Sequence, residues 1–315
     1  MIGVDAYLDF LDQEYLRVYL EQGGAAVKFA VVSEGSAPGL LNGIAEVAGR
    51  ANYAVATVDA ATTRAHLLDR VFFDVARQLD WDALALTTAA DAVAVAGYPA
   101  PSAGALSLDA LAVHHRVDVR ELKRDTDRQL QSQVHRDYAM VQEFRTAMLR
   151  LCQAQLRTGQ VADAEHTAVL DWLRGDLRQI SALRSALIFR RIARHNARQM
   201  LFSTSHWLAV NGRAGLVLVL DIRRFALSRR PSLAEREGHY YTKAALLDAY
   251  EMLRQLVDST DELNHALVLV VADPTFLTDG ARGLDAYQAL KLRIFDEVRD
   301  LHRDNPFSSL VRLAA

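Results

Sequence analysis

The sequence has a single cysteine, Cys152, among its 315 residues. One cysteine excludes an intramolecular disulfide and a zinc site built from several cysteines. The chain also lacks an uninterrupted apolar run of the roughly 18 residues that a transmembrane helix needs. Its first residues include acidic side chains and no continuous apolar segment, which does not fit a signal peptide. These absences predict a cytoplasmic protein with no membrane partner.

Neither basic nor acidic residues are in large excess. The formal net charge is -3 and the pI is near 6.4, so the whole-chain charge does not indicate a nucleic-acid partner, although local basic patches stay open. The motifs H-E-x-x-H and G-x-S-x-G are absent, and no Ser/His/Asp arrangement can be ordered from spacing. We therefore predict no metal centre. A hydrophobic content of 51% supports a sizeable core.

Short apolar runs alternate with helical patterns near both ends of the chain. Apolar runs predict buried strands at 25–32, 53–60, 214–222 and 265–273. Helical spacing predicts helices at 5–22, 39–51, 64–79, 241–260 and 284–301, and nearly all of 117–210 also fits helix. Alternating strands and helices favour a parallel sheet. The sequence thus predicts an α/β fold in which a helical segment interrupts the sheet.

The expected organisation has four parts. We predict an N-terminal helix at 1–22, a first half of the α/β core at 23–110, a helical insertion at 111–212 and a second half of the core at 213–315. Residues 97–107, rich in glycine and proline, are the best candidate for a linker or long loop.

The loop after the first predicted strand has the layout of a phosphate-binding loop. Its residues are Ser33, Glu34, Gly35, Ser36, Ala37, Pro38 and Gly39. A working loop of this kind, G-x-x-x-x-G-K-[ST], presents backbone N–H groups and a lysine to phosphates, and a hydroxyl to Mg²⁺. Here no lysine follows the glycine, Pro38 has no N–H to donate, and Glu34 adds negative charge. On these residues alone, a plain turn is favoured over a phosphate site.

Asp221 ends the strand predicted at 214–222. An acidic residue in this place, a Walker B acid, positions Mg²⁺ in P-loop ATPases. Hydrolytic ATPases usually have a glutamate next, and this chain has Ile222. Asp221 is therefore a candidate for a residual metal-positioning acid, and an ordinary turn cap is an equally good interpretation.

A basic cluster in the predicted insertion is a candidate DNA-binding surface. It consists of Arg184, Arg190, Arg191, Arg194 and Arg198, with His195 among them. Helical spacing would place most of them near one face, and no acidic residue occurs between Asp176 and Asp221. A basic helix face can bind phosphates, but a solvated face is the favoured alternative.

Several stretches in order resemble a known family. They are "YLEQGGAAVKFAVVSEGS", "YAVATVDA", "VLDWLRGD", "NARQMLFSTSHWLAVNGRAGLVLVLD", "LVLVVADPTFLTDGARGLDAYQALKLRI" and "DNPFSSLVRL". Together they look like the P-loop ATP-binding proteins of BREX-type bacterial phage-defence systems, the BrxC/BrxD-like group. The resemblance implies a P-loop NTPase-like (AAA+/RecA-like) parallel sheet with a large helical insertion.

The departures from the family pattern bear on activity. The Gly-Lys-Ser/Thr positions of the family loop fall on Ala37, Pro38 and Gly39, and the glutamate after the Walker B acid falls on Ile222. Only Asp221 remains of the catalytic set. The resemblance, with these departures, implies a catalytically degenerate ATPase-like subunit with a structural or regulatory role, which does not hydrolyse ATP and has no ATP or Mg²⁺ cofactor.

The implied partners are other subunits of the defence system, an active paralogous ATPase among them, and DNA, in a homo- or hetero-oligomer. Such a subunit could lend an arginine to a paralogue in trans. The candidates are Arg282, Arg293, Arg223 and Arg224, with Arg293 ranked first. Two alternatives stay open. One is a nucleotide-binding ATPase with a non-standard loop, its lysine supplied by Lys28 or Lys243. The other is a DNA-binding module that uses the basic cluster.

Overall fold

A computed structural model describes residues 1–100, 106–157, 161–230, 237–295 and 304–314. The chain divides into two compact units. A sheet unit consists of 1–75 and 208–315, and a helical unit consists of 76–207. Among the described helices, none is both long enough and apolar enough to cross a bilayer.

In its described residues, the sheet unit has six strands, all of them parallel, in the order β1-β6-β2-β5-β4-β3. The strands are β1 (Ile2–Gly3), β2 (Ala25–Val31), β3 (Tyr53–Asp59), β4 (Gly215–Asp221), β5 (Ala266–Ala272) and β6 (Leu310–Ala314). The four strands predicted from apolar runs are β2 to β5, so the predicted parallel sheet is confirmed. β5 lies between the strand that precedes the glycine-rich loop and the strand that ends in Asp221, as expected for the P-loop NTPase-like class.

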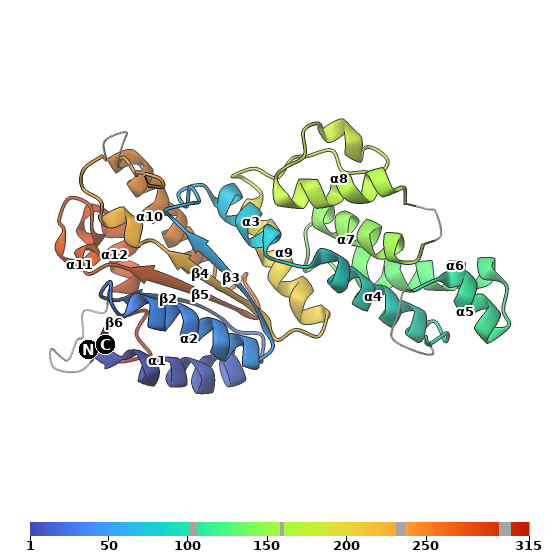
Figure 1. Ribbon diagram of the computed structural model, residues 1–315, viewed down its shortest axis with the longest axis horizontal. Coiled ribbons are helices and arrows are strands. Elements are labelled where there is room, and N and C mark those ends of the chain that lie inside the picture. The colour runs from blue at the N-terminus through green and yellow to red at the C-terminus, as the bar shows by residue number, and fades with distance from the viewer. Residues whose placement is uncertain (101–105, 158–160, 231–236, 296–303, 315) are drawn as a thin grey trace. The chain divides into compact units, whose positions relative to one another are not determined.

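Helices cover both faces of this sheet (Figure 1). The helices of the sheet unit are α1 (Val4–Phe10), a π-helical turn (Leu11–Tyr19), α2 (Ala37–Arg50), α3 (Leu68–Arg77), a 3-10 turn (Arg223–Ala226), α10 (Lys243–Asp258), α11 (Thr275–Thr278), a 3-10 turn (Leu284–Ala286) and α12 (Gln288–Ile294). On one face, α1, the π-helical turn and α2 bury alternate residues of β2, β4, β5 and β6 in a continuous core. On the other face, Phe29 of β2 stacks on Phe276, which packs edge-on against Tyr250 of α10.

This distribution of helices follows from the strand order. The chain leaves β2 through α2 toward β3 at one edge, and later leaves β5 toward β6 on the other side of β2. Right-handed crossovers in opposite directions place their helices on opposite faces. The sheet therefore has a switch point between β2 and β5, where ligands of open α/β sheets bind at the carboxyl ends.

The helical unit is built from helices that pack on one another. They are α4 (Trp81–Val95), α5 (Leu108–His115), α6 (Val119–Leu130), a π-helical turn (Gln131–His135), α7 (Gln142–Gln155), α8 (Asp163–Arg174), a 3-10 turn (Ile180–Leu183) and α9 (Ala197–Val210). The indole of Trp81, which is buried, packs edge-on against Phe144 of α7. α4 thus belongs to this unit, which begins at Ala76 and ends at Trp207 rather than at 111 and 212. Of the linker predicted at 97–107, residues 101–105 lie outside the described residues.

Three predicted helices differ from the structure. The helix expected at 64–79 begins at Leu68, because the residues before it form turns. The helix expected at 284–301 begins at Gln288 and ends at Ile294, where Phe295 takes an extended conformation, and 296–303 lie outside the described residues. The helical pattern that covers nearly all of 117–210 does not hold at 175–196: this segment is turns, extended backbone and the short 3-10 turn.

Candidate functional site

The carboxyl ends of β2, β3, β4 and β5 carry the candidate site. β2 leads into the loop of Ser33 to Ser36, which ends at α2. β3 and β4 end at Asp59 and Asp221, which are partners in the parallel register, so the two carboxylates stand side by side at this edge. The loop and Asp221 are thus brought to the same end of the sheet, as the family resemblance implies.

The loop is a tight turn that uses its own donors. The N–H groups of Ser36 and Ala37 both donate to the carbonyl of Ser33 at 3.1 Å, and the hydroxyls of Ser33 and Ser36 lie 2.9 Å apart. Pro38 stands in the first turn of α2, where a proline is well tolerated because that N–H has no helical partner. Two amides that a phosphate loop would present to phosphate are therefore engaged within the loop, and a third is absent.

Asp221 is bound by an arginine of its own strand end. The Arg223 guanidinium contacts both carboxylate oxygens, with Nε 2.9 Å from Oδ1 and Nη2 2.6 Å from Oδ2. The backbone N–H of Arg223 donates to Oδ1 as well, at 3.1 Å. The Asp221 side chain is 7% exposed and that of Arg223 is 28% exposed. A bidentate pair of this kind holds both oxygens that could coordinate a cation.

The negative charges of two further acids also act on the Arg223 guanidinium. Its pKa is raised above the ordinary value, chiefly because it hydrogen-bonds to Asp221, while the negative charges of Asp221, Asp59 and Glu34 add to the shift against the effect of burial. Glu34 belongs to the loop, so the loop contributes negative charge to this cluster. The guanidinium is the positive centre of a group of three carboxylates.

The residues present do not fit Mg²⁺–ATP in the manner of a P-loop ATPase. Such a site needs a lysine on the β/γ-phosphates and an acid that is free to position the metal. Here the loop of Ser33 to Gly39 contains no lysine, Glu34 adds negative charge, and Asp221 is held by Arg223.

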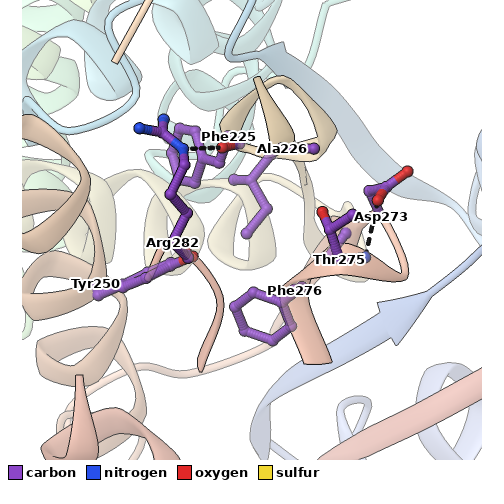
Figure 2. A pocket seen from close by; sticks show the side chains of 9 residues that line it. Phe225, Ala226, Tyr250, Asp273, Thr275, Phe276 and Arg282 are labelled. Atoms are coloured by element: carbon purple, nitrogen blue, oxygen red, sulfur yellow. Dashed lines mark hydrogen bonds between the residues drawn. The ribbon is translucent and has the colours of Figure 1, made fainter. Parts of the chain in front are cut away.

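A small cavity lies beside the site, on the face of α10 (Figure 2). Its volume is about 10 Å³, enough for about one water molecule and far too small for a nucleobase. Asp273 accepts the N–H of Thr275 at 2.8 Å and so begins α11, and Arg282 donates to the carbonyl of Phe225 at 3.1 Å. The polar groups around this cavity therefore serve local structure.

Arg282, Arg293 and Lys28 do not gather at the loop. Arg282 donates to the carbonyl of Tyr241 at 2.9 Å as well, and so connects the carboxyl-end turns to one another. Arg293 of α12 donates to Asp258 at 2.6 Å, and Asp258 is the last residue of α10, at the opposite end of the sheet. Lys28 lies five residues before Ser33, about 16 Å along an extended strand, and it contacts the carbonyls of Phe307 and Ser308. The suggestion that Lys28 could supply the missing loop lysine is therefore wrong.

The basic cluster is not one helical face. Arg184 follows the 3-10 turn, Arg190, Arg191 and Arg194 lie in non-helical backbone, and only Arg198 lies in α9. The reason is tertiary: the indole of Trp172 donates to the carbonyl of Arg190 at 2.9 Å, and Arg191 donates to the carbonyl of Leu177 at 3.3 Å. These bonds hold the chain in turns where local pattern predicts helix. Arg184, Arg190, Arg191 and Arg194 are nevertheless exposed.

Sequence reasoning missed two features of the site. Asp59 ends the second predicted strand, and the parallel register that pairs it with Asp221 could have been inferred from strand ends alone. The pairing of Arg223 with Asp221 had a weaker signal, because an arginine two residues after a strand-end acid is equally consistent with a solvated side chain.

The sheet order, the switch-point loop and the acid at the end of β4 define a P-loop NTPase-like protein. The family model described as BREX system ATP-binding protein BrxC/D matches residues 1–315, the whole chain. The chain therefore belongs to this family, and the resemblance noted in the sequence is confirmed. No curated protein and no solved structure matches it.

Proposed function

We propose that this chain is a subunit of a BREX phage-defence system in which the P-loop fold does not hydrolyse ATP and acts through its contacts with other subunits. The observation that carries the proposal is the bidentate pair of Arg223 and Asp221. An internal cation occupies the acid that would position Mg²⁺, and the loop has no lysine to replace it. Loss of one charge-assisted hydrogen bond costs about 1.5–3 kcal/mol of binding free energy. Here both the loop and Asp221 lack a contact that Mg²⁺–ATP would need.

The partner that fits this proposal best is an active paralogous ATPase of the same system. A P-loop fold without its catalytic groups keeps the outer surfaces through which such folds assemble. An arginine lent in trans is part of the proposal. Arg293, which is 39% exposed, is a better candidate than Arg282, whose guanidinium donates to two carbonyls of its own chain.

Calorimetric titration with Mg²⁺–ATP and a phosphate-release assay test the proposal. We expect no saturable binding below about 1 mM and phosphate release at the background rate, with an active P-loop ATPase as the positive control in the same buffer. Tight binding with turnover would refute the proposal. Tight binding without turnover would favour the alternative of a nucleotide-binding protein with a non-standard loop, Lys243 being its remaining candidate lysine.

We infer DNA binding as a second candidate function. It is supported by the exposure of Arg184, Arg190, Arg191 and Arg194 in a stretch, between Asp176 and Asp221, that has no acidic residue. The arginines lie on turns, and Arg190 lies 3.7 Å from a carboxylate oxygen of Glu143. Their exposure leaves the side chains accessible to phosphates. The hypothesis predicts binding that weakens with salt and with removal of these side chains.

A further inference from the structure

The amino half of β2 has a partner strand on one side only. β5 pairs with β2 along the whole of Ala25–Val31, whereas β6 pairs with it over Phe29 to Val31. Within the residues that the structure describes, the half of β2 from Ala25 to Lys28 therefore has no ladder partner on the side of β6. Because β2 lies inside the sheet, the unpaired segment from Ala25 to Lys28 is short, and helices lie on both faces of it.

The main-chain groups of this edge point to the vacant side. The N–H of Phe29 donates to the carbonyl of Ser309 at 2.7 Å, on the side of β6, and the N–H of Val32 donates to Ala272 of β5. Because strand residues alternate in direction with a period of two, the N–H and C=O of Val27 face the same side as those of Phe29. Such groups are a template for one more strand.

A pocket of about 520 Å³ occupies this position. Its walls come from both faces of the sheet: Glu14, Tyr15, Val18 and Tyr19 of the π-helical turn on one face, and Val257 at the end of α10 on the other. Val18 is 48% exposed, and Tyr19 and Phe307, which also line the pocket, are 49% and 58% exposed. Its volume is in the range of about 300–1,000 Å³ found for ligand sites, and its rim exposes large apolar side chains.

A cation lies on the pocket floor. Lys28 is 3% exposed, and its ammonium donates to the carbonyls of Phe307 and Ser308 at 2.6 and 3.1 Å. It also lies 4.5 Å from the centre of the Tyr15 ring. These contacting groups are neutral, so the charge of Lys28 is not balanced by a carboxylate in contact with it in the described part of the chain. Burial lowers the pKa of Lys28 to about 8, so the ammonium form still dominates at neutral pH.

We propose that this pocket binds an extended apolar peptide segment that ends in a carboxylate, supplied by a partner protein. The segment adds to the free half of β2 as a short strand, its side chains alternate between the two walls, and its carboxylate is attracted by Lys28. Main-chain bonds would supply affinity and the two walls would supply selectivity, as in other cases of strand addition.

The free main-chain groups favour a peptide over a small apolar acid. A fatty or aromatic acid could fill the apolar volume and reach Lys28, but it would cover the N–H and C=O of Val27 without bonding to them. A buried polar group that is left without a partner weakens binding. A peptide strand satisfies the same groups with its own backbone, so it is the better complement to this pocket.

The experiment is fluorescence anisotropy of the full chain with labelled pentapeptides. The probe is Val-Ala-Val-Ala-Val with a free carboxylate, and the comparison peptides are the same sequence amidated and the same sequence with a central proline, which cannot continue a strand ladder. We expect saturable binding tighter than about 1 mM, weaker binding of the amide, and a loss of at least about tenfold with proline. Absence of saturation, equal binding of the proline peptide, or binding of octanoate without the peptide would overturn the proposal.

Two variants locate the site. Val18→Asp places a charge on the exposed rim, and we expect it to weaken binding of the probe by about tenfold. Val113→Asp, on an exposed position of α5 in the helical unit, is the matched control and should bind like the unchanged protein. Lys28→Met should reduce the difference between the free and amidated peptides. Equal binding by Val18→Asp and the control would show that the peptide binds elsewhere.

Discussion

Arg223 shows what a single residue does to the end of this sheet. Three carboxylates, those of Asp59, Asp221 and Glu34, act on its guanidinium, and like charges so close together would otherwise repel one another. Mg²⁺ supplies the positive charge at this position in active P-loop ATPases. In this chain a guanidinium that is covalently part of the protein supplies one positive charge among these three carboxylates.

Arg223→Met tests that role. Removing the guanidinium leaves the nearly buried Asp221 carboxylate without its partner, and breaking such a pair costs about 3–5 kcal/mol of the free energy of unfolding. The vacated carboxylates should then accept a cation, so millimolar Mg²⁺ should raise the Tm of Arg223→Met and leave that of the unchanged protein where it is. Urea unfolding and thermal melts, each with and without Mg²⁺, measure both effects.

The control for this experiment is the double variant Asp221→Asn with Arg223→Met. It removes the acid that Mg²⁺ would bind, so its response to Mg²⁺ should be much smaller than that of Arg223→Met alone. Equal stabilisation of the unchanged protein by Mg²⁺ would contradict the role that we assign to Arg223.

At the scale of elements, α10 and α12 are joined through one glutamate. Glu251 of α10 accepts hydrogen bonds at 2.6 Å from Arg254 and from the hydroxyl of Tyr287, the residue before α12. Gln255 donates to the same carboxylate at 2.8 Å. The ion pair with Arg254 lies mostly within reach of water, so the joint contribution of these bonds to stability is modest.

This cluster gives a pH prediction. The pKa of Glu251 is lowered from 4.5 to about 2, chiefly by the hydrogen bond from Arg254, with burial opposing and Tyr287 and Gln255 adding to the shift. Because the folded-state pKa is below the unfolded one, the contribution is fully present above pH 4.5 and is lost as the pH falls toward about 2. The free energy of unfolding of the unchanged protein minus that of Glu251→Gln should therefore be constant above pH 4.5 and shrink below it.

Urea unfolding across this pH range is the measurement. Glu46→Gln, on the exposed side of α2, controls for the loss of one carboxylate elsewhere in the same unit. A difference between the unchanged protein and Glu251→Gln that stays the same down to pH 2 would rule out this assignment.

The central strands could be predicted from sequence because each is a continuous apolar run buried on both faces, as "GLVLVLD" and "ALVLVVA" are. β1 and β6 could not. β1 has two residues, and β6 acquires its pairing only when it meets β2 and β1. The same limit applies to the turns at 175–196, where side chains such as Trp172 and Arg191 bond to carbonyls that helical periodicity would have assigned to the backbone.

The candidate site also has a part that sequence could predict and a part that it could not. The positions of the loop and of Asp221 follow from strand ends, so sequence reasoning could place them together. Whether the loop amides turn outward or inward, and whether Arg223 turns toward Asp221, are decided by contacts within a few residues that have several conformations of similar energy. These local choices bear directly on the chemistry.

At the scale of the whole molecule, the helical unit interrupts the sheet unit between β3 and β4. The chain passes between the units within α3 and within α9, since the division falls after Val75 and after Trp207. Junctions inside helices have no excess of glycine or proline, so composition does not reveal them, and the proline-containing stretch after α4 is a misleading boundary signal. The acid-free arginine stretch falls mostly within the helical unit, so a chain with a net charge of -3 has a segregated positive segment.

The DNA hypothesis belongs to this scale, because only a local patch could attract DNA to a chain of net negative charge. Arg184→Ala with Arg194→Ala removes two exposed charges and spares Arg191, which donates to Leu177 and holds the turn. Loss of two phosphate contacts should weaken binding to duplex DNA by about tenfold or more and reduce the salt slope by about 2. Anisotropy with a labelled duplex at several salt concentrations measures both, and Arg120→Ala with Arg136→Ala, two exposed arginines elsewhere in the helical unit, controls for net charge. If both double variants weaken binding equally, the effect is one of overall charge, and the arginine turns are not the DNA-binding surface.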